Sequence, residues 1–170
     1  MKRPPEKKVA QRTEPVILFG VGDYVFAIAA AAVEEIRNTE GLQEIGIASD
    51  LLVPKVKYKL KREGRSYYVV DANLYFRMIP SHATRVLVLR NSKVALLVSH
   101  IDRMAEMGNV LALPHAFRGD ERCWYRGLTV FDPAGEMPTV VPVVKADAFL
   151  TESELRAVEA GEPRKKLEAQ

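Results

Sequence analysis

Side chains that commonly catalyse reactions or bind metals are few in this sequence and follow no functional spacing. The three histidines, His82, His100 and His115, are not separated by the intervals that direct several ligands at one zinc ion. The single cysteine, Cys123, has no second thiolate, and nothing beside it would orient it against His115 as nucleophile and base. The sequence therefore predicts neither a metal site nor a thiol or esterase centre built on Cys123.

Glycine and carboxylate motifs give no better catalytic candidate. The segment Gly20-Val21-Gly22 is too short for a dinucleotide loop and precedes a strand, whereas such phosphate loops precede helices. Glu34 and Glu35 are adjacent, so on a strand they point to opposite faces and cannot act as an acid–base pair. Three aspartates fall where turns need capping side chains, namely Asp71, Asp102 and Asp132. We expect no enzymatic activity and no cofactor.

The elements that position these residues are mainly β-strands, and two similar hairpins dominate the pattern. In Val16–Ile36, two apolar runs flank a Gly/Asp turn, which is typical of a hairpin. A variant of this segment returns at Val86–Met104. Each copy ends in a similar four-residue unit, Val33–Ile36 in the first and Ile101–Met104 in the second. The predicted hairpin strands cover residues 16–20, 23–28, 85–90 and 93–99.

Each hairpin is followed by a second predicted strand pair, at residues 56–61 with 66–70 and at 124–131 with 139–144. The first pair leads into a short helical turn capped by Asp71 or Asn73. Thr151-Glu152-Ser153-Glu154 forms a capping box that begins a terminal helix over residues 152–160, which Gly161 ends. Because these units recur in the same order, we infer two related small barrels.

The predicted organisation is one domain over residues 15–160 between flexible ends. Its two intertwined barrel subdomains cover roughly 15–80 and 81–150, while 1–14 form a basic leader and 161–170 a tail. The strands contain more apolar side chains than two small barrels can bury. We therefore expect exposed apolar patches that bind a partner.

The net charge of +3 belongs to the ends of the chain. Residues 1–14 carry a surplus of three positive charges and 161–170 a surplus of one, which leaves the middle near −1. A basic strand around Lys57, Lys59, Lys61 and Arg62, with Tyr58, leaves a nucleic-acid-binding barrel as an alternative, which the near-neutral middle disfavours. No apolar run is long enough to span a membrane, and one cysteine suits a reducing compartment, so we expect a cytoplasmic protein.

The sequence resembles the CheW-like adaptor family of bacterial chemosensory systems from about Pro15 to Leu155. The matching segments are ILFGVGDYVFAI with VEEI, the Gly64-Arg65 turn before VVDANLYF, RVLVLRNSKVALLVSHI, and YRGLTVFD followed by VVPVVKADAFL. This resemblance implies an all-β fold of two SH3-like five-stranded barrels packed together. It also implies a non-catalytic scaffold in two-component signal transduction, which couples the cytoplasmic tips of chemoreceptors to the regulatory domain of a CheA-type histidine kinase.

The resemblance further implies a partner-binding surface. Its expected residues are Val33, Glu35, Ile36, Glu63 and Gly64, with Val98 and Ile101 as their counterparts in the second barrel. For the apolar members, core packing is an equally good interpretation. The chain also departs from the family pattern, because Lys61-Arg62-Glu63-Gly64 stands where Asn-Leu-Arg-Gly is usual and Ser99 stands at an acidic position. It therefore resembles a divergent member.

Overall fold

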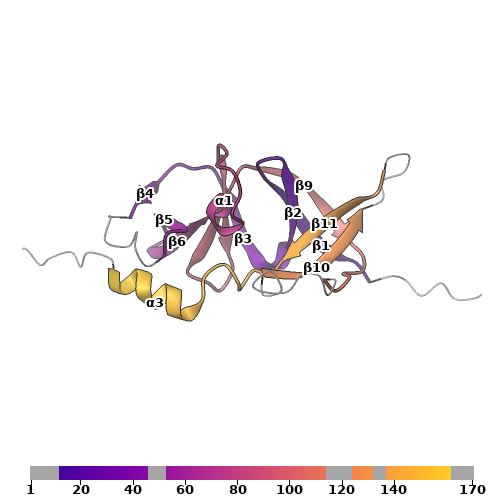
Figure 1. Ribbon diagram of the computed structural model, residues 1–170. Helices are drawn as coiled ribbons and strands as arrows, with labels where there is room; N and C mark the ends of the chain where they lie inside the picture. Colours follow the sequence, from indigo (N-terminus) through magenta and orange to yellow (C-terminus); the bar gives the residue numbers. More distant parts are fainter. Residues whose placement is uncertain (1–11, 46–52, 114–123, 132–136, 162–170) are drawn as a thin grey trace, which may run out of the picture.

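The computed structural model describes residues 12–45, 53–113, 124–131 and 137–161, and its strands form two sheets (Figure 1). In chain order the elements are β1 Glu14–Val21, β2 Tyr24–Ala29, the 3₁₀ turn η1 Ala30–Ala32, β3 Val33–Arg37, β4 Leu42–Glu44, β5 Val56–Arg62, β6 Arg65–Asp71, α1 Ala72–Tyr75, β7 Arg85–Leu89, β8 Val94–Val98, β9 His100–Met107, β10 Tyr125–Phe131, β11 Thr139–Val144 and α3 Glu152–Gly161.

One sheet has the strand order β10-β11-β2-β1-β9, and we call it the first barrel. The other has the order β3-β7-β8-β6-β5-β4, and we call it the second barrel. Figure 1 shows the two side by side, with α3 next to the second barrel. The predicted all-β fold with two sheet subdomains, a short helical turn and a C-terminal helix is confirmed.

The two barrels exchange one strand each. β3 follows the first hairpin in sequence but pairs with β7 of the second, and β9 follows the second hairpin but pairs with β1 of the first. The later strands also correspond, because β11 lies parallel to β2 as β6 lies parallel to β8. The second barrel therefore takes residues 33–98, between the two parts of the first. This differs from the expected division near residue 80, since repeated patterns do not show which copy a strand joins.

The hairpin strands are buried on both faces. In β1, Val16 and Leu18 point into the first barrel, whereas Ile17, Phe19 and Val21 point into a core between the barrels. β8 alternates in the same way, with Ala95 and Leu97 in the second barrel and Val94, Leu96 and Val98 in the shared core. We call this shared set the junction core. It accounts for much of the apolar surplus of the strands, because strands covered on two sides need continuous apolar runs. Large apolar side chains are nevertheless exposed among the described residues, Ile36 and Met104 included.

Aromatic rings fasten the two barrels together beside α1. Phe76, directly after α1, stacks on Phe26 of β2 with ring centroids 4.3 Å apart. Tyr75 of α1 lies edge-on to Phe149 at 4.9 Å, and its hydroxyl donates a hydrogen bond of 3.1 Å to the carbonyl oxygen of Ala148. Such pairs add about 0.5–1.5 kcal/mol each beyond the area that they bury. The segments that follow β6 and β11 thus meet in the junction core.

Ser99, between β8 and β9, takes part in a chain of hydrogen bonds between side-chain hydroxyl groups and the backbone. Its hydroxyl oxygen accepts a 2.8 Å hydrogen bond from the backbone N–H of Gly22, in the turn between β1 and β2. The hydroxyl groups of Ser99 and Ser81 are 2.8 Å apart, and Ser81 donates to the side-chain oxygen of Asn73. Since the Ser81 proton is used there, Ser99 must donate to Ser81. The hydroxyl chain fixes the first hairpin turn to the residues around α1.

The capping interactions expected at both helices are confirmed. Asp71 accepts from the N–H of Asn73 at the start of α1. At α3, Thr151 accepts from the N–H of Glu154, while the Glu154 carboxylate accepts from the N–H of Thr151 and from Lys55. Burial alone would raise the pKa of Glu154, but the hydrogen bonds from Lys55 and Thr151 outweigh it, so the pKa lies below its ordinary value.

Leu96→Ala should destabilise the whole protein by about 3 kcal/mol, because it leaves a cavity in the junction core. Urea denaturation followed by far-UV circular dichroism and by the fluorescence of Trp124, the single tryptophan, should show one coincident transition. Leu74→Ala, at a partly exposed position of α1, serves as the control and should cost under about 1 kcal/mol. Two separate transitions in the parent protein would contradict a shared core.

Thr151→Ala should lower the free energy of unfolding by about 1 kcal/mol, because it removes the helix cap. Because folding lowers the pKa of Glu154, the ionised carboxylate stabilises the fold fully above the ordinary value of 4.5 and progressively less as the pH falls through the folded-state pKa. Unfolding free energies measured across this acidic range should therefore depend less on pH in Glu154→Gln than in the parent. An unchanged pH dependence would show that the pairing is not formed in solution.

Candidate partner-binding surface

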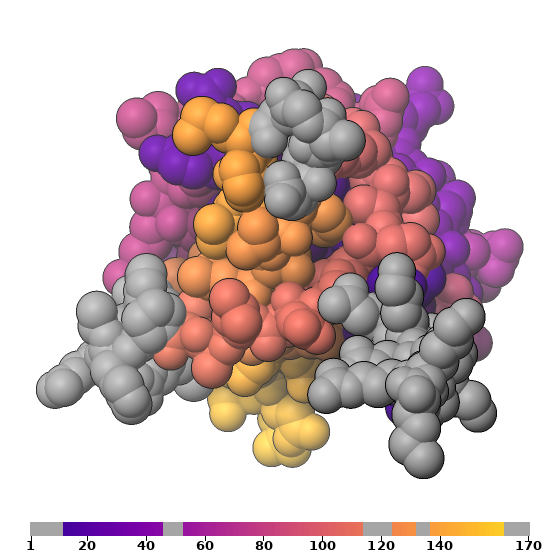
Figure 2. All heavy atoms as spheres, turned by 90° about the vertical axis from the view of Figure 1, so that its right-hand side faces the viewer, coloured from indigo at the N-terminus to yellow at the C-terminus, as the bar shows by residue number. Residues whose placement is uncertain are grey.

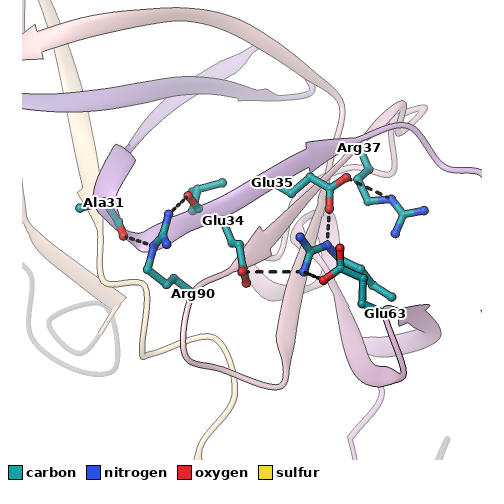
Figure 3. A network of polar contacts seen from close by, with 8 residues as sticks. Ala31, Glu34, Glu35, Arg37, Glu63 and Arg90 are labelled. Atoms are coloured by element: carbon teal, nitrogen blue, oxygen red, sulfur yellow. Dashed lines mark hydrogen bonds and ion pairs between the residues drawn. The ribbon is translucent and has the colours of Figure 1, made fainter.

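A cluster of charged side chains joins β3 to the turn between β5 and β6 (Figure 3). The Arg62 guanidinium donates a hydrogen bond to the Glu35 carboxylate and lies 3.8 Å from Glu34 and 3.7 Å from Glu63. Arg37 lies 3.9 Å from Glu35 on its other side. We call these five residues the Arg62 cluster. Since β3 is the outermost strand of its sheet, the cluster holds an edge that would otherwise be attached on one side only.

The charges of the Arg62 cluster are nearly balanced, with three carboxylates around two guanidinium groups. The hydrogen bond to Glu35 raises the pKa of Arg62 above its ordinary value, and burial opposes this only in part. Arg62 therefore remains a cation, and its planar group can contact several carboxylates at once. The cluster can orient β3 and present carboxylates to a partner, but it contains no group suited to nucleophilic chemistry.

The turn beside the cluster has the backbone that a tight hairpin requires. Glu63 has a φ of 49° and Gly64 a φ of 76°, and both values lie in the left-handed region. No atom lies within 4 Å of where a Cβ on Gly64 would stand, so the turn geometry rather than crowding favours glycine there. The Glu63 side chain is largely exposed, and the turn therefore projects a carboxylate next to Arg62.

The structure divides the predicted site residues into two groups. Glu35, Ile36, Glu63 and Gly64 lie at the surface around the Arg62 cluster or next to it, and Ile36 is 39% exposed. The other three point into or against the junction core: Val33 at 7% exposed, Val98 at 0%, and half-buried Ile101 on β9 of the first barrel. The side chains of Val33 and Val98 are thus not available at the surface of this fold.

Two arginines organise this region, and sequence reasoning gave them no such role. Arg62 reaches a carboxylate 27 residues earlier in the chain. Arg90, after β7, donates to the carbonyl oxygens of Ala31 at 3.1 Å and Val33 at 3.4 Å, which fixes the 3₁₀ turn before β3. The sequence places each arginine at the end of a predicted strand, next to a turn. It does not show the strand arrangement that brings them to β3.

The nucleic-acid alternative finds little support in the geometry. Arg62 is turned toward Glu35, so the charge of the basic strand is partly neutralised. Tyr68, which lies opposite Lys59, is only 5% exposed, and Tyr58 packs against the core of the second barrel. Sequence-independent binding of single strands needs exposed aromatic faces for stacking, and these tyrosines do not provide them.

Within residues 12–45, 53–113, 124–131 and 137–161, no group of three or more histidine, cysteine, aspartate or glutamate residues could hold a metal ion. His82 and His100 are exposed there, whereas His115, Cys123 and Asp132 fall outside the described residues. In the same part of the chain, no helix has both the length and the apolar character needed to cross a membrane.

Comparison with solved structures finds the same overall fold in another protein. The chain resembles the crystal structure of the scaffolding protein TtCheW from Thermoanaerobacter tengcongensis with a TM-score of 0.63. The likeness covers 79% of this chain and 90% of that chain at 11% sequence identity. No family model and no curated protein matches the sequence. At this identity, the comparison establishes the fold.

Arg62→Ala should loosen β3 without unfolding the protein, because it removes the contacts between the edge strand and the β5–β6 turn. Hydrogen exchange at the amides of Glu34–Ile36 should become roughly tenfold faster, as expected for a local opening. Arg65→Ala, which removes an exposed arginine across the same hairpin, is the matched control and should leave these amides unchanged. Equal effects of the two substitutions would contradict a specific role for Arg62.

Proposed function

We propose that this protein is a non-catalytic adaptor of a bacterial chemosensory system. It works in the cytoplasm and couples chemoreceptor tips to the regulatory domain of a CheA-type histidine kinase. The observation that carries this proposal is the two-barrel fold shared with the scaffolding protein TtCheW.

The Arg62 cluster and Ile36 form the surface that we assign to the partner. Ile36 supplies an exposed apolar side chain on an edge strand, and the carboxylates of Glu35 and Glu63 lie at Arg62 beside the same strand. Apolar and charged groups of this kind occur together in protein–protein interfaces. Because Arg62 and Arg90 already fix β3 and the turn before it, little conformational freedom is lost when a partner binds.

The strand exchange gives an adaptor two comparable surfaces. β3 presents Ile36 on the second barrel, and the corresponding strand β9 presents Met104, which is 59% exposed, on the first. Figure 2 views the first barrel from its end, where residues of β9 and those after it (coral) lie beside β10 and β11 (orange). A scaffold that joins two different proteins needs two such surfaces, and the duplicated fold supplies them at separate places.

Glu35→Arg and Ile36→Asp should each weaken binding to the regulatory domain of the CheA-type kinase from the same organism by roughly tenfold or more, as expected for substitutions in an interface centre. Isothermal titration calorimetry with the full chain measures this directly. Asp23→Arg makes the same charge change at an exposed position of the turn between β1 and β2, outside both surfaces, and serves as the control. Substitutions at Val33 or Val98 are unsuitable, because both side chains are buried in the junction core.

Circular dichroism of each variant must match that of the parent, so that lost binding reports on the surface rather than on folding. If the parent protein binds neither a kinase regulatory domain nor a chemoreceptor of its own organism, the adaptor proposal is wrong. If binding occurs but is equally sensitive at Asp23, the proposed surface is wrong and the adaptor function stands.

A further inference from the structure

A groove of about 980 Å³ lies between α3 and the end of the second barrel at which β6 and β8 begin and β7 ends. Its base is apolar, formed by Tyr68, Leu89, Val94, Leu150 and Leu155. The groove does not include any residue of the Arg62 cluster. Its volume is at the upper end of what small-molecule sites occupy, and the groove is partly open to solvent, so a macromolecular segment can enter it.

The two sides of the groove carry opposite charges. The strand side contributes Arg65, Arg90 and Lys93, and the helix side contributes Asp147, Glu152 and Glu159. At one place the sides are joined, because Lys93 and Glu159 form an ion pair of 3.0 Å. Within the described residues, Arg65 has no ion pair. The guanidinium of Arg90 donates to the backbone carbonyl oxygens of Ala31 and Val33 and forms no ion pair there. The strand side therefore offers the Arg65 guanidinium, and the N–H groups of Arg90 that do not bind Ala31 and Val33, to incoming carboxylates.

We propose that this groove binds an amphipathic α-helix of a partner protein, with an apolar stripe on the base, acidic residues against Arg65 and Arg90, and basic residues against Asp147 and Glu152. The charge pattern excludes a nucleic acid, because phosphates would be repelled along the whole helix side. A β-strand partner is also excluded here, since β6 and β8 lie inside the sheet and have no free edge.

The dimensions of α3 set the length of the occupant. Its ten residues extend about 15 Å, so a partner helix lying alongside it would make contact over about three turns. Apolar residues spaced at i, i+4 and i+7 would all face the base over this distance. A second copy of α3 does not meet these requirements, because its exposed residues Glu152, Arg156 and Glu159 are charged and its apolar residues already pack inward.

The probe for this proposal is a synthetic helical peptide of about 15 residues, long enough for partial helicity. It carries leucines at i, i+4 and i+7, glutamates along one flank and lysines along the other. Titration into the full chain labelled with ¹⁵N should shift the amides of Tyr68, Lys93 and Leu155 saturably, with a dissociation constant below about 1 mM. A peptide of the same composition with its leucines distributed around the helix, and one with lysines on both flanks, should bind at least about tenfold more weakly.

Two matched variants locate the site. Arg65→Glu should weaken binding of the peptide roughly tenfold, and the effect should diminish in high salt because the contact is exposed. Arg85→Glu makes the same change at the opposite end of the sheet, at the start of β7, and should leave affinity unchanged. No binding, binding insensitive to Arg65→Glu, or amide shifts confined to other surfaces would overturn the proposal.

Self-association is tested in the same samples. A concentration-dependent dimer that the peptide displaces would assign the groove to a second copy of this chain and overturn the proposal. Glu35→Arg tests independence from the adaptor function, because that residue lies outside the groove. Unchanged peptide binding by this variant supports a separate helix site, and this result holds whether or not a kinase binds at the Arg62 cluster.

Discussion

Burial of both faces of the hairpin strands is the constraint on which this structure depends. Because β1 and β8 contribute alternate residues to their own barrel and to the junction core, neither barrel can withdraw without exposing a continuous apolar face. The aromatic contacts beside α1 and the hydroxyl chain at Ser99 add directional contacts to this burial. Both proposed binding surfaces lie on elements that this core keeps in place, so they are preformed.

The same burial explains what could and could not be predicted from the sequence. Strand positions, the Glu63–Gly64 turn and the capping box at Thr151 follow from local patterns, and the structure has them close to where they were expected. An alternating strand shows which side chains point inward only when one face is wet. Val98 belongs to a strand with no wet face, and Val33 begins a short strand whose other residues are exposed or half-buried, so the sequence left core and interface equally open for both.

The contacts of the candidate surface could not be predicted from local sequence patterns. Arg62 and Glu35 lie on strands that are not hydrogen-bonded neighbours, and they meet only because the sheet curls until its ends approach each other. The repeated hairpins indicated two barrels correctly. They could not indicate that β3 and β9 are exchanged, since either arrangement satisfies the same apolar runs and turn residues.

The exchange of β3 and β9 also has a consequence for how the chain acquires its structure during synthesis. The strands of the second barrel have all left the ribosome once Val98 has emerged, whereas the first barrel still lacks β9, β10 and β11. Until residue 144 follows, Leu87, Leu96 and Val98 have no complete partner surface to cover them. Completion of the first barrel before the second is therefore ruled out by connectivity, and these apolar side chains stay partly uncovered until synthesis has passed β11.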